Sequence, residues 1–325
     1  MRAIEFHEYG GPEVLRLVQA ATPEPGPGEV AIDVAWAGVN FADVKARAEG
    51  YRVDELPYRP GLEVSGHVLA VGEGVDGIEV GQEVAALVGG GGYADVVLAR
   101  ADSVFTLPEG LDLRTAATLP TVLPTAHALI HEVGRLRTGE SVLVHGAAGG
   151  IGTAVGQLAR AAGAGAVYGV ASTEAKATYA LKHGYDEVFR PDTFAEDVRK
   201  ATGGRGVDLV LDPVGGETLR RGLDALAPFG RLVSFGNAGG GAPWQVGQPE
   251  LYGQGHAVAG FSVLTLAQTA PAAARALTER ALRAVSEGAV TLPVTAEFPL
   301  ADAAEAHRLL GGRGSTGKLL LRVKD

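Results

Sequence analysis

The sequence predicts an α/β fold in which a doubly wound, parallel six-stranded sheet is inserted into a mainly β domain. Three observations lead to this prediction. Short segments of strand character separated by Gly and Pro fill residues 1 to about 120, a strand–helix–strand rhythm starts at about residue 142, and an apolar strand ends the chain. We expect one domain at 1–121 and 265–325 and the inserted domain at 122–264.

The first domain opens with residues 1–6, where polar and apolar side chains alternate as in a strand. Turn signals such as Pro25-Gly26-Pro27-Gly28 separate the segments that follow. We expect strands at Glu29–Ala37, Glu63–Val71, Glu83–Leu87 and Tyr93–Leu98.

The second domain is predicted from its alternating strands and helices. Several strand candidates are continuous apolar runs, as a parallel sheet covered on both faces requires. A helix with Val155, Leu158 and Ala159 on one face follows the first strand. The expected strands are Val142–His145, Ala166–Ala171, Glu187–Phe189, Val207–Asp212, Arg231–Phe235 and Ala257–Val263.

The remaining residues read as two helices, Ala272–Ser286 and Ala301–Leu310, and an apolar strand, Lys318–Val323. A terminal strand needs a sheet to pair with. We therefore expect the C-terminus to return to the first domain.

Composition excludes several functions. The chain contains no cysteine, so disulfides, thiolate–zinc sites and a cysteine nucleophile are excluded. The formal net charge of −10 disfavours nucleic-acid binding. No apolar run of about 18 residues occurs, and the first residues do not resemble a signal peptide. We expect no membrane partner and a cytoplasmic location.

The strongest local signal is the segment from Val142 to Gly152, in which an apolar strand runs through a turn of small residues into an amphipathic helix. This pattern is typical of a dinucleotide-binding turn. A small residue permits the tight turn, a glycine lets the pyrophosphate approach, and a glycine lets the helix pack closely; the free amides of the helix then face the phosphates. The cofactor-binding residues expected here are Ala147, Gly149, Gly150, Ile151 and Gly152.

The end of the second strand indicates which coenzyme is bound. An NAD enzyme places a carboxylate there for the ribose 2′-hydroxyl, whereas this chain has Ala171 and Ser172. Ser172, Lys176 and Arg190 are candidates for binding a 2′-phosphate, which favours NADPH. Thr173 is expected to cap the helix, and Lys176 has the alternative interpretation of a solvated surface lysine.

Taken together, the motifs resemble those of the zinc-independent quinone oxidoreductase (zeta-crystallin-like) branch of the medium-chain dehydrogenase/reductase superfamily. The resemblance covers nearly the whole chain. It rests on Gly38–Asp43, Pro60–Glu63, Gly92–Asp95, His145–Gly152, Gly206–Gly216 and Ser315–Lys318. It implies a Rossmann domain inserted into a GroES-like substrate domain, NADPH as the cofactor, and a homodimer, with the edge strand around Ala257–Val263 as a candidate interface.

The resemblance also implies site residues. Asn40 matches an asparagine near the nicotinamide and the acceptor, although an Asn that only stabilises the turn after Gly38 is as good an interpretation. Thr125 matches a threonine near the nicotinamide, with a helix cap as the alternative. Tyr51 is a candidate for the pocket entrance. The backbones of Val214, Gly215, Gly236 and Asn237 are expected to face the cofactor, because they follow strands at their carboxyl ends.

The predicted reaction follows from a missing metal site. The zinc alcohol dehydrogenases of the superfamily have Cys in place of Asn40 and His in place of Leu62. Without a Lewis acid, an electron-poor acceptor is easier to reduce than an alcohol is to oxidise. We therefore expect NADPH to reduce a quinone or another α,β-unsaturated carbonyl compound. A 2-alkenal or enoyl reductase and a low-turnover NADPH-binding protein remain alternatives.

Overall fold

The computed structural model describes residues 1–242 and 245–324, and the chain falls into two compact units. The first unit contains Met1–Thr121, Leu266–Leu282 and the residues from Leu292 to the C-terminus. The second contains Val122–Thr265 and Arg283–Thr291. Residues 283–291, which we expected in the first domain, thus lie with the second unit.

The first unit is built on a seven-stranded sheet with the order β14-β15-β3-β4-β5-β7, in which β6 pairs with β3. The C-terminal strand β15 lies between β14 and β3, so the predicted return of the chain to this sheet is confirmed. The strands are β3 (Glu29–Val39), β4 (Glu63–Val71), β5 (Glu83–Leu87), β6 (Val96–Arg100), β7 (Val104–Thr106), β14 (Val294–Pro299) and β15 (Lys318–Arg322).

A two-stranded antiparallel sheet and several helices complete this unit. Its hydrophobic core takes side chains from β3, β4, β15 and α11, including Ile32, Val68 and Leu321. The small sheet is β1 (Arg2–Glu5) with β2 (Arg16–Gln19), and the helices are α1 (Phe41–Glu49), α2 (Leu113–Ala116), α10 (Pro271–Ser286) and α11 (Ala303–Gly311).

The second unit contains a parallel sheet with the order β10-β9-β8-β11-β12-β13. This order reverses at β8, as in doubly wound dinucleotide-binding sheets, and confirms the predicted fold class. The strands are β8 (Ser141–His145), β9 (Ala166–Val170), β10 (Glu187–Phe189), β11 (Val207–Asp212), β12 (Leu226–Ser234) and β13 (Ala257–Gly260).

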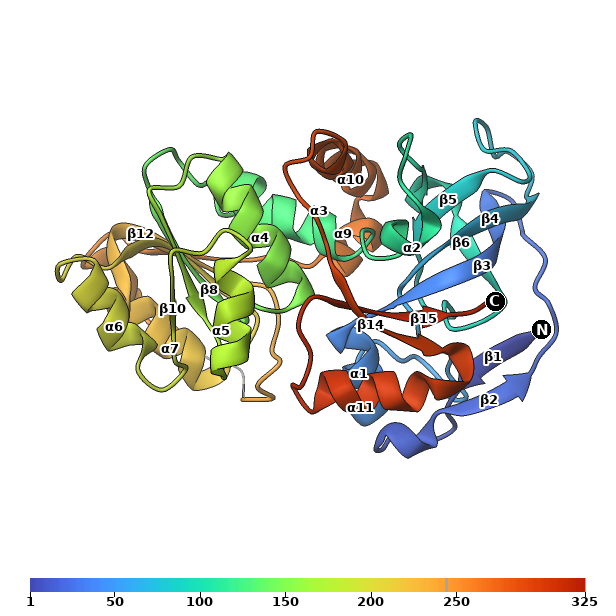
Figure 1. Ribbon diagram of the computed structural model, residues 1–325, viewed down its shortest axis with the longest axis horizontal. Coiled ribbons are helices and arrows are strands. Elements are labelled where there is room, and N and C mark those ends of the chain that lie inside the picture. The colour runs from blue at the N-terminus through green and yellow to red at the C-terminus, as the bar shows by residue number, and fades with distance from the viewer. Residues whose placement is uncertain (243–244, 325) are drawn as a thin grey trace. The chain divides into compact units, whose positions relative to one another are not determined.

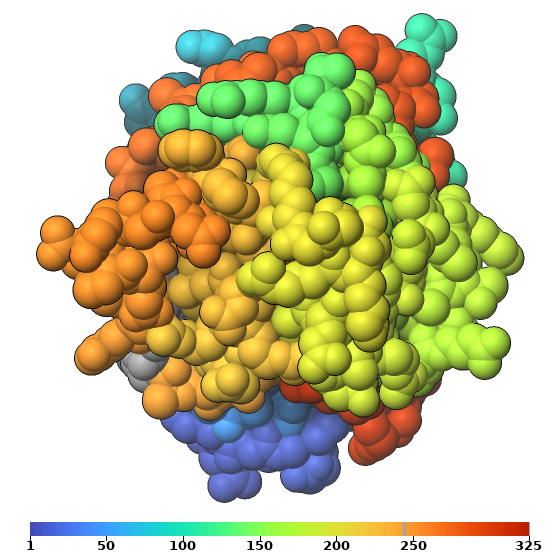
Figure 2. Space-filling model, turned by 90° about the vertical axis from the view of Figure 1, so that its left-hand side faces the viewer, coloured from blue at the N-terminus to red at the C-terminus, as the bar shows by residue number. Residues whose placement is uncertain are grey.

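Helices cover both faces of this sheet, with α4 and α5 on one side and α6 and α7 on the other (Figure 1). Every residue of β8 and β11 is buried, which explains their continuous apolar character. In Figure 2 this unit faces the viewer, and the yellow to orange segments form much of the visible surface. The helices are α3 (Val122–His127), α4 (Gly150–Ala161), α5 (Glu174–Leu181), α6 (Phe194–Ala201), α7 (Gly216–Asp224) and α8 (Gln248–Tyr252), and α9 spans Val263–Thr269.

Three predicted strands differ in their bounds. The strand expected at Tyr93–Leu98 is displaced to β6, because Tyr93 pairs outside the sheet, where its carbonyl accepts from Ile4 and its amide donates to Pro60. β12 begins at Leu226, five residues before the predicted start at Arg231. The strand expected to reach Val263 ends at Gly260, and Val263 starts α9.

Candidate active site

The turn between β8 and α4 has the geometry of an anion-binding helix start. Gly146 adopts a φ of +70°, a conformation that favours glycine, and Gly149 precedes α4 in extended conformation. The amides in the first turn of any helix have no intrahelical acceptor. In α4 no side chain caps them either. These amides and the helix dipole attract a negatively charged group.

The two key glycines of the turn differ in their surroundings. A Cβ added to Gly152 would lie 2.4 Å from the carbonyl oxygen of Gly146, so only glycine lets α4 pack this close to the turn. A Cβ added to Gly149 would meet nothing nearer than the Gly146 oxygen at 3.4 Å. Space therefore lies in front of Gly149, where the dinucleotide pattern places a phosphate. The turn fits a dinucleotide diphosphate.

Ala147, the first small residue of the pattern, is fully buried. Its amide donates to the carbonyl of Val170 at the end of β9 (3.2 Å). A Cβ on Gly169 would come within 2.8 Å of the Ala147 side chain, so the two small residues allow the turn to pack against β9. Gly150 and Ile151 begin α4.

The carboxyl ends of β9 and β10 bring three candidate residues to one edge of the sheet. Val170 and Phe189 are paired, so Ser172 and Arg190 follow adjacent strands, and both are exposed. Thr173 caps α5 as predicted, because its hydroxyl accepts from the Lys176 amide (3.3 Å). Lys176 lies half-buried in the first turn of α5. The end of β9 carries no carboxylate that would repel a 2′-phosphate.

The segment carrying Arg190 is held in place from α7. The Arg221 guanidinium donates to the carbonyls of Pro191 and Asp192 and lies over the Phe194 ring, 4.6 Å from its centroid. The turn after β10 is therefore fixed by backbone contacts that leave the Arg190 side chain exposed.

The residues that follow β11 and β12 run side by side. Buried Asp212 accepts from the amides of Val214 (2.5 Å) and Gly215 (3.1 Å), which fixes the turn after β11. Burial raises the pKa of the Asp212 carboxyl. The Gly215 φ of +76° favours glycine, and an added Cβ would lie 2.7 Å from the Asn237 side-chain oxygen. A Cβ on Gly236 would lie 2.9 Å from the Pro213 carbonyl.

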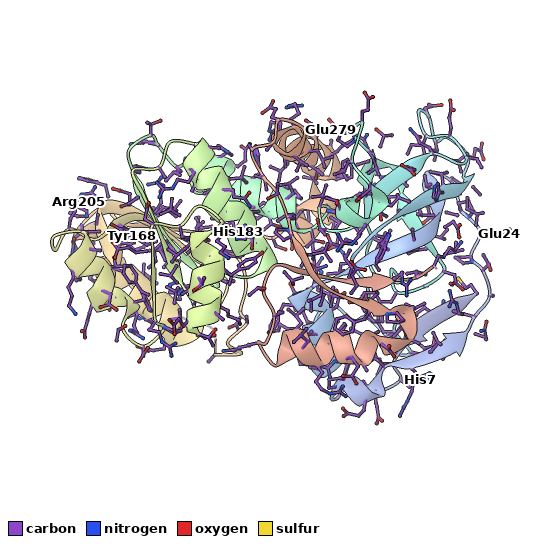
Figure 3. All side chains as sticks on the ribbon, in the orientation of Figure 1. His7, Glu24, Tyr168, His183, Arg205 and Glu279 are labelled. Atoms are coloured by element: carbon purple, nitrogen blue, oxygen red, sulfur yellow. The ribbon has the colours of Figure 1, made fainter. Side chains whose placement is uncertain are left out.

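Asp208 is remote from this edge. It lies at the amino end of β11 and forms an ion pair with Arg205 (2.5 Å), whose position at the edge of the unit is labelled in Figure 3. Arg205 and hydrogen bonds from Ser141 lower the pKa of Asp208 to about 2 against the opposing effect of burial. Asp208 and Asp212 thus lie near the two ends of a buried strand.

The structure places Thr125 and Tyr51 in different surroundings. Thr125 is buried inside α3 rather than at its start, so the interpretation as a helix cap is wrong. Tyr51 is exposed and directly follows Gly50, the left-handed residue that ends α1. His67 is also exposed, and its Nε2 lies 3.6 Å from Glu83 Oε1 at the surface.

In the first unit, Asn40 is the first member of a buried polar network. Its side-chain nitrogen donates to Glu63 Oε1 (2.9 Å), and its side-chain oxygen accepts from Lys318 Nζ (3.0 Å). Lys318 also forms an ion pair with Glu63 Oε1 (2.6 Å), and the other Glu63 oxygen accepts from the Thr121 amide (2.8 Å). The contact of Asn40 with the Gly38 carbonyl is longer, at 3.5 Å. Asn40 therefore binds the ion pair more closely than the turn.

Asp43 extends the network from α1. Its carboxylate accepts from the amides of Asn40 (2.9 Å) and Gly61 (3.0 Å), and the Tyr93 hydroxyl donates to it at 3.3 Å. His307 Nε2 lies 3.3 Å from the same hydroxyl. Burial raises the pKa of Asp43 to about 7, and burial lowers the pKa of His307 to about 3.

No individual role for Glu63 or Lys318 was predicted from the sequence. Both lie in segments quoted for the resemblance, Pro60–Glu63 and Ser315–Lys318, but these segments are far apart in the chain. One signal could have indicated the pair: both charged residues lie within or beside apolar strands, where an unpaired charge would destabilise the fold. Only the pairing of β15 and β4 with β3 brings the two together.

Comparisons with known proteins agree with this architecture. Residues 26–109 match the model of the alcohol dehydrogenase GroES-like domain, and residues 150–279 match that of the zinc-binding dehydrogenases. The quinone oxidoreductase of Sus scrofa is 34% identical, with 99% of this chain and 97% of that protein covered. The quinone oxidoreductase of Pseudomonas aeruginosa is also 34% identical, covering 98% of this chain and 99% of that protein.

A solved structure is similar over the same length. The Escherichia coli quinone oxidoreductase complexed with NADPH has a TM-score of 0.91 and 33% identity, and covers 99% of this chain and 100% of that one. Fold and turn define a dinucleotide-binding oxidoreductase of the medium-chain type. The chain belongs to the quinone oxidoreductase branch of the medium-chain dehydrogenase/reductase superfamily.

Two kinds of feature are absent from the described residues: a cluster of metal ligands and a membrane-spanning helix. Across residues 1–242 and 245–324, no group of three or more His, Cys, Asp or Glu is arranged to hold a metal ion. Within the same part of the chain, no helix combines the length and apolar character needed to cross a bilayer.

Proposed function

We propose that the protein reduces a quinone by hydride transfer from NADPH, without a metal ion. The proposal rests chiefly on the turn at Gly149, where an uncapped helix start and open space meet at the carboxyl edge of a doubly wound sheet. Relatives named as quinone oxidoreductases, one of them solved with NADPH, support the choice of coenzyme and acceptor.

Residues 122–264 form the proposed NADPH-binding domain. Here the amides of Gly150, Ile151 and Gly152 would bind the diphosphate. Ser172, Lys176 and Arg190 follow the ends of β9 and β10 and would bind the 2′-phosphate. The rest of the proposed coenzyme-binding set is Ala147, Gly149, Thr125, Val214, Gly215, Gly236 and Asn237, together with Asn40.

Residues 1–121 and 265–325 form the proposed substrate domain. Asn40 would orient the acceptor carbonyl through its side-chain amide, and Tyr51 would line the pocket entrance. NADPH, when bound, supplies the hydride, and the acceptor takes up a proton from solvent to complete the reduction. The protein contributes binding, orientation and exclusion of water.

The zinc-free character is proposed from the residues at two positions. Asn40 donates to Glu63 and accepts from Lys318, so its side chain already has partners, and Leu62 has no lone pair for a metal. Activity should therefore survive prolonged dialysis against a chelator, with less than stoichiometric zinc measured in the active protein. Loss of activity that added zinc restores would contradict the proposal.

The reaction is tested by steady-state kinetics with NADPH and three acceptors: a naphthoquinone, an aliphatic 2-alkenal and an enone. We expect the highest kcat/KM with the quinone. A higher value with the alkenal or enone would assign the alternative reductase activity. Coenzyme oxidation with none of them, although NADPH binds, would indicate a low-turnover binding protein.

Coenzyme choice is tested with the Lys176→Ala variant. The wild type should bind NADPH more tightly than NADH, and the substitution should weaken NADPH binding by about tenfold while leaving NADH unchanged. Lys182→Ala, outside the first turn of the same helix, is the matched control. Equal affinity of the wild type for both coenzymes would refute the phosphate assignment.

We also propose that the protein is a cytoplasmic homodimer. β13 is the last strand of its sheet, so one edge is available for pairing with a second copy. The cytoplasmic location is proposed because an enzyme that oxidises NADPH needs a compartment in which this coenzyme is kept reduced. Light scattering at micromolar concentration would test the dimer, and a monomeric mass would contradict it.

A further inference from the structure

The buried ion pair behind Asn40 carries an inference that rests on the proposed function. We propose that Lys318 and Glu63 are positioning residues, which fix the orientation of the Asn40 amide so that its nitrogen donates a hydrogen bond to the carbonyl oxygen of the acceptor.

The hydrogen bonds define the orientation of the amide. An asparagine side chain offers two N–H donors and one carbonyl acceptor, and its two ends are easily exchanged by rotation. Here a Lys318 ammonium hydrogen faces the Asn40 oxygen at 3.0 Å, and the Glu63 carboxylate faces the Asn40 nitrogen at 2.9 Å. A flipped amide would place a donor against the ammonium and an acceptor against the carboxylate. The ion pair therefore permits only one orientation.

One N–H of Asn40 is left for a ligand. The first is used by Glu63, and among the described residues the second has only the distant Gly38 carbonyl at 3.5 Å. A carbonyl oxygen on the acceptor is a stronger partner, because it gains negative charge as the hydride arrives. Donation from Lys318 to the amide oxygen polarises the amide and strengthens this remaining donor.

The burial of the three side chains indicates which of them contacts the substrate. Glu63 and Lys318 are 0% and 3% exposed, whereas Asn40 keeps 9% of its surface exposed. Asn40 is the most exposed of these three buried residues, so we assign the contact with a small molecule to it. The two charges thus act through the asparagine and not by direct contact.

The surrounding fold leaves space for this arrangement. A Cβ on Gly38 would lie 2.3 Å from Glu63 Oε1. Glycine is therefore needed at this position of β3, because the Glu63 carboxylate lies against its backbone. The second Glu63 oxygen accepts from the Thr121 amide, and Lys318 Nζ also donates to the Val39 carbonyl (3.3 Å). Both partners of the side-chain amide are therefore fixed from their own sides.

The first test observes the amide directly. The sequence contains asparagine only at positions 40 and 237, so selective ¹⁵N labelling of asparagine gives two side-chain amide signals. In the full-length wild type without coenzyme, the Asn40 pair should be widely split and slow to exchange with water. In Lys318→Met the Asn40 pair should shift and exchange faster, whereas the Asn237 pair should stay unchanged. An unchanged Asn40 pair would overturn the proposal.

The second test measures coupling between the two residues. Lys318→Met and Asn40→Ala should each lower kcat with the quinone, on the order of tenfold to a hundredfold, and Lys318→Met should keep NADPH affinity within about twofold of the wild type. Because Lys318 acts through Asn40, the double variant should be no slower than the slower single variant. Effects that multiply in the double variant would show that Lys318 acts independently, and would overturn the proposal.

Two further variants keep the tests interpretable. Lys318→Met leaves the Glu63 carboxylate buried without its partner and can lower stability, so Lys318→Met with Glu63→Gln removes both charges together. This pair should also lose the ordered Asn40 signals, and retention of the wild-type signals would contradict the proposal. Lys318→Arg, which keeps a charged donor, should restore part of kcat. Failure of the wild type to reduce any acceptor would refute the proposed function, but the amide spectra would still test the orientation.

Discussion

At the scale of single residues, the glycine turn was largely predictable because its spacing encodes its geometry. A close strand-to-helix turn requires a residue without a side chain at Gly152. The structure shows why, because an added Cβ would collide with the Gly146 carbonyl. The network of Asn40, Glu63 and Lys318 was not predictable in the same way. Asn40 follows β3, Glu63 starts β4 and Lys318 starts β15. No local sequence spacing predicts that these three residues are in contact.

Asp43 provides a prediction about pH at this scale. Its pKa is about 7 in the folded protein and near 3.8 in the unfolded chain, so the folded state holds the proton more strongly. The contribution of Asp43 to stability is therefore greatest below pH 3.8 and is lost as the pH rises toward 7. We expect Asp43→Asn to lack this loss, so that the difference in unfolding free energy between wild type and variant changes steadily from pH 5 to 7.

Urea denaturation of both proteins at several pH values measures this difference. A difference that is constant over this range would contradict the raised pKa. Asp33→Asn is a suitable control, because Asp33 is a partly exposed residue that pairs with Lys324 near the surface.

At the scale of elements, strands with continuous apolar runs were located well and their ends less well. β8, β9, β10 and β11 lie within one residue of the predicted bounds, and every residue of β8 and β11 is buried. β12 starts five residues before the predicted position, and Phe229 within it adopts a φ of +62°. The pairing of this earlier part with β11 is irregular: Leu226 pairs with Val207, and the regular register starts at Arg231 opposite Leu209. α1 was not predicted, since its polar sequence has no apolar stripe.

Two helices that start at threonine give a matched prediction. The Thr173 side chain accepts a hydrogen bond at the start of α5, whereas Thr193 at the start of α6 makes no such bond. Both are exposed. Thr173→Ala should therefore lower the free energy of unfolding by about 1 kcal/mol. Thr193→Ala should change it by less than about 0.5 kcal/mol.

Chemical denaturation of the two variants under identical conditions measures the contrast. Equal losses in both variants would mean that the capping bond of Thr173 contributes nothing of its own.

At the scale of the whole molecule, two buried histidines make stability depend on acid. His145 packs edge-on against Phe194, with ring centroids 4.6 Å apart, and His307 packs edge-on against Tyr93. Burial lowers the pKa of each to about 3, so both stay neutral in the folded protein. Their contribution to stability is present above pH 6.5 and is lost as the pH falls toward 3.

We therefore expect His145→Gln to lose less stability than the wild type between pH 6.5 and 5, the range above the usual titration of carboxylates. The comparison should be made as a wild-type-minus-variant difference, because Asp43 acts in the opposite direction over the same range. His183→Gln is the control: this residue, labelled in Figure 3, lies after α5 and is only partly buried. Parallel curves for the wild type and His145→Gln would contradict the lowered pKa.

The overall layout was the most predictable feature at this scale. The change of rhythm near residue 142 and the apolar C-terminal strand sufficed to predict an inserted doubly wound sheet and the return of the chain. The assignment of 283–291 to the second unit was not predictable, since a helix such as α10 carries no sequence signal for the unit on which its end packs.

The central claim is that a nicotinamide coenzyme places its diphosphate at the start of α4, and a titration with NADPH followed by nucleotide fluorescence tests it most directly. Gly149→Val should weaken binding by about tenfold or more, because the added side chain fills the open space before the first-turn amides. Gly247→Val changes a glycine that also precedes a helix in extended conformation without a side-chain cap, and it should bind like the wild type. Wild-type affinity in the Gly149 variant, or no saturable binding by the wild type, would contradict the account.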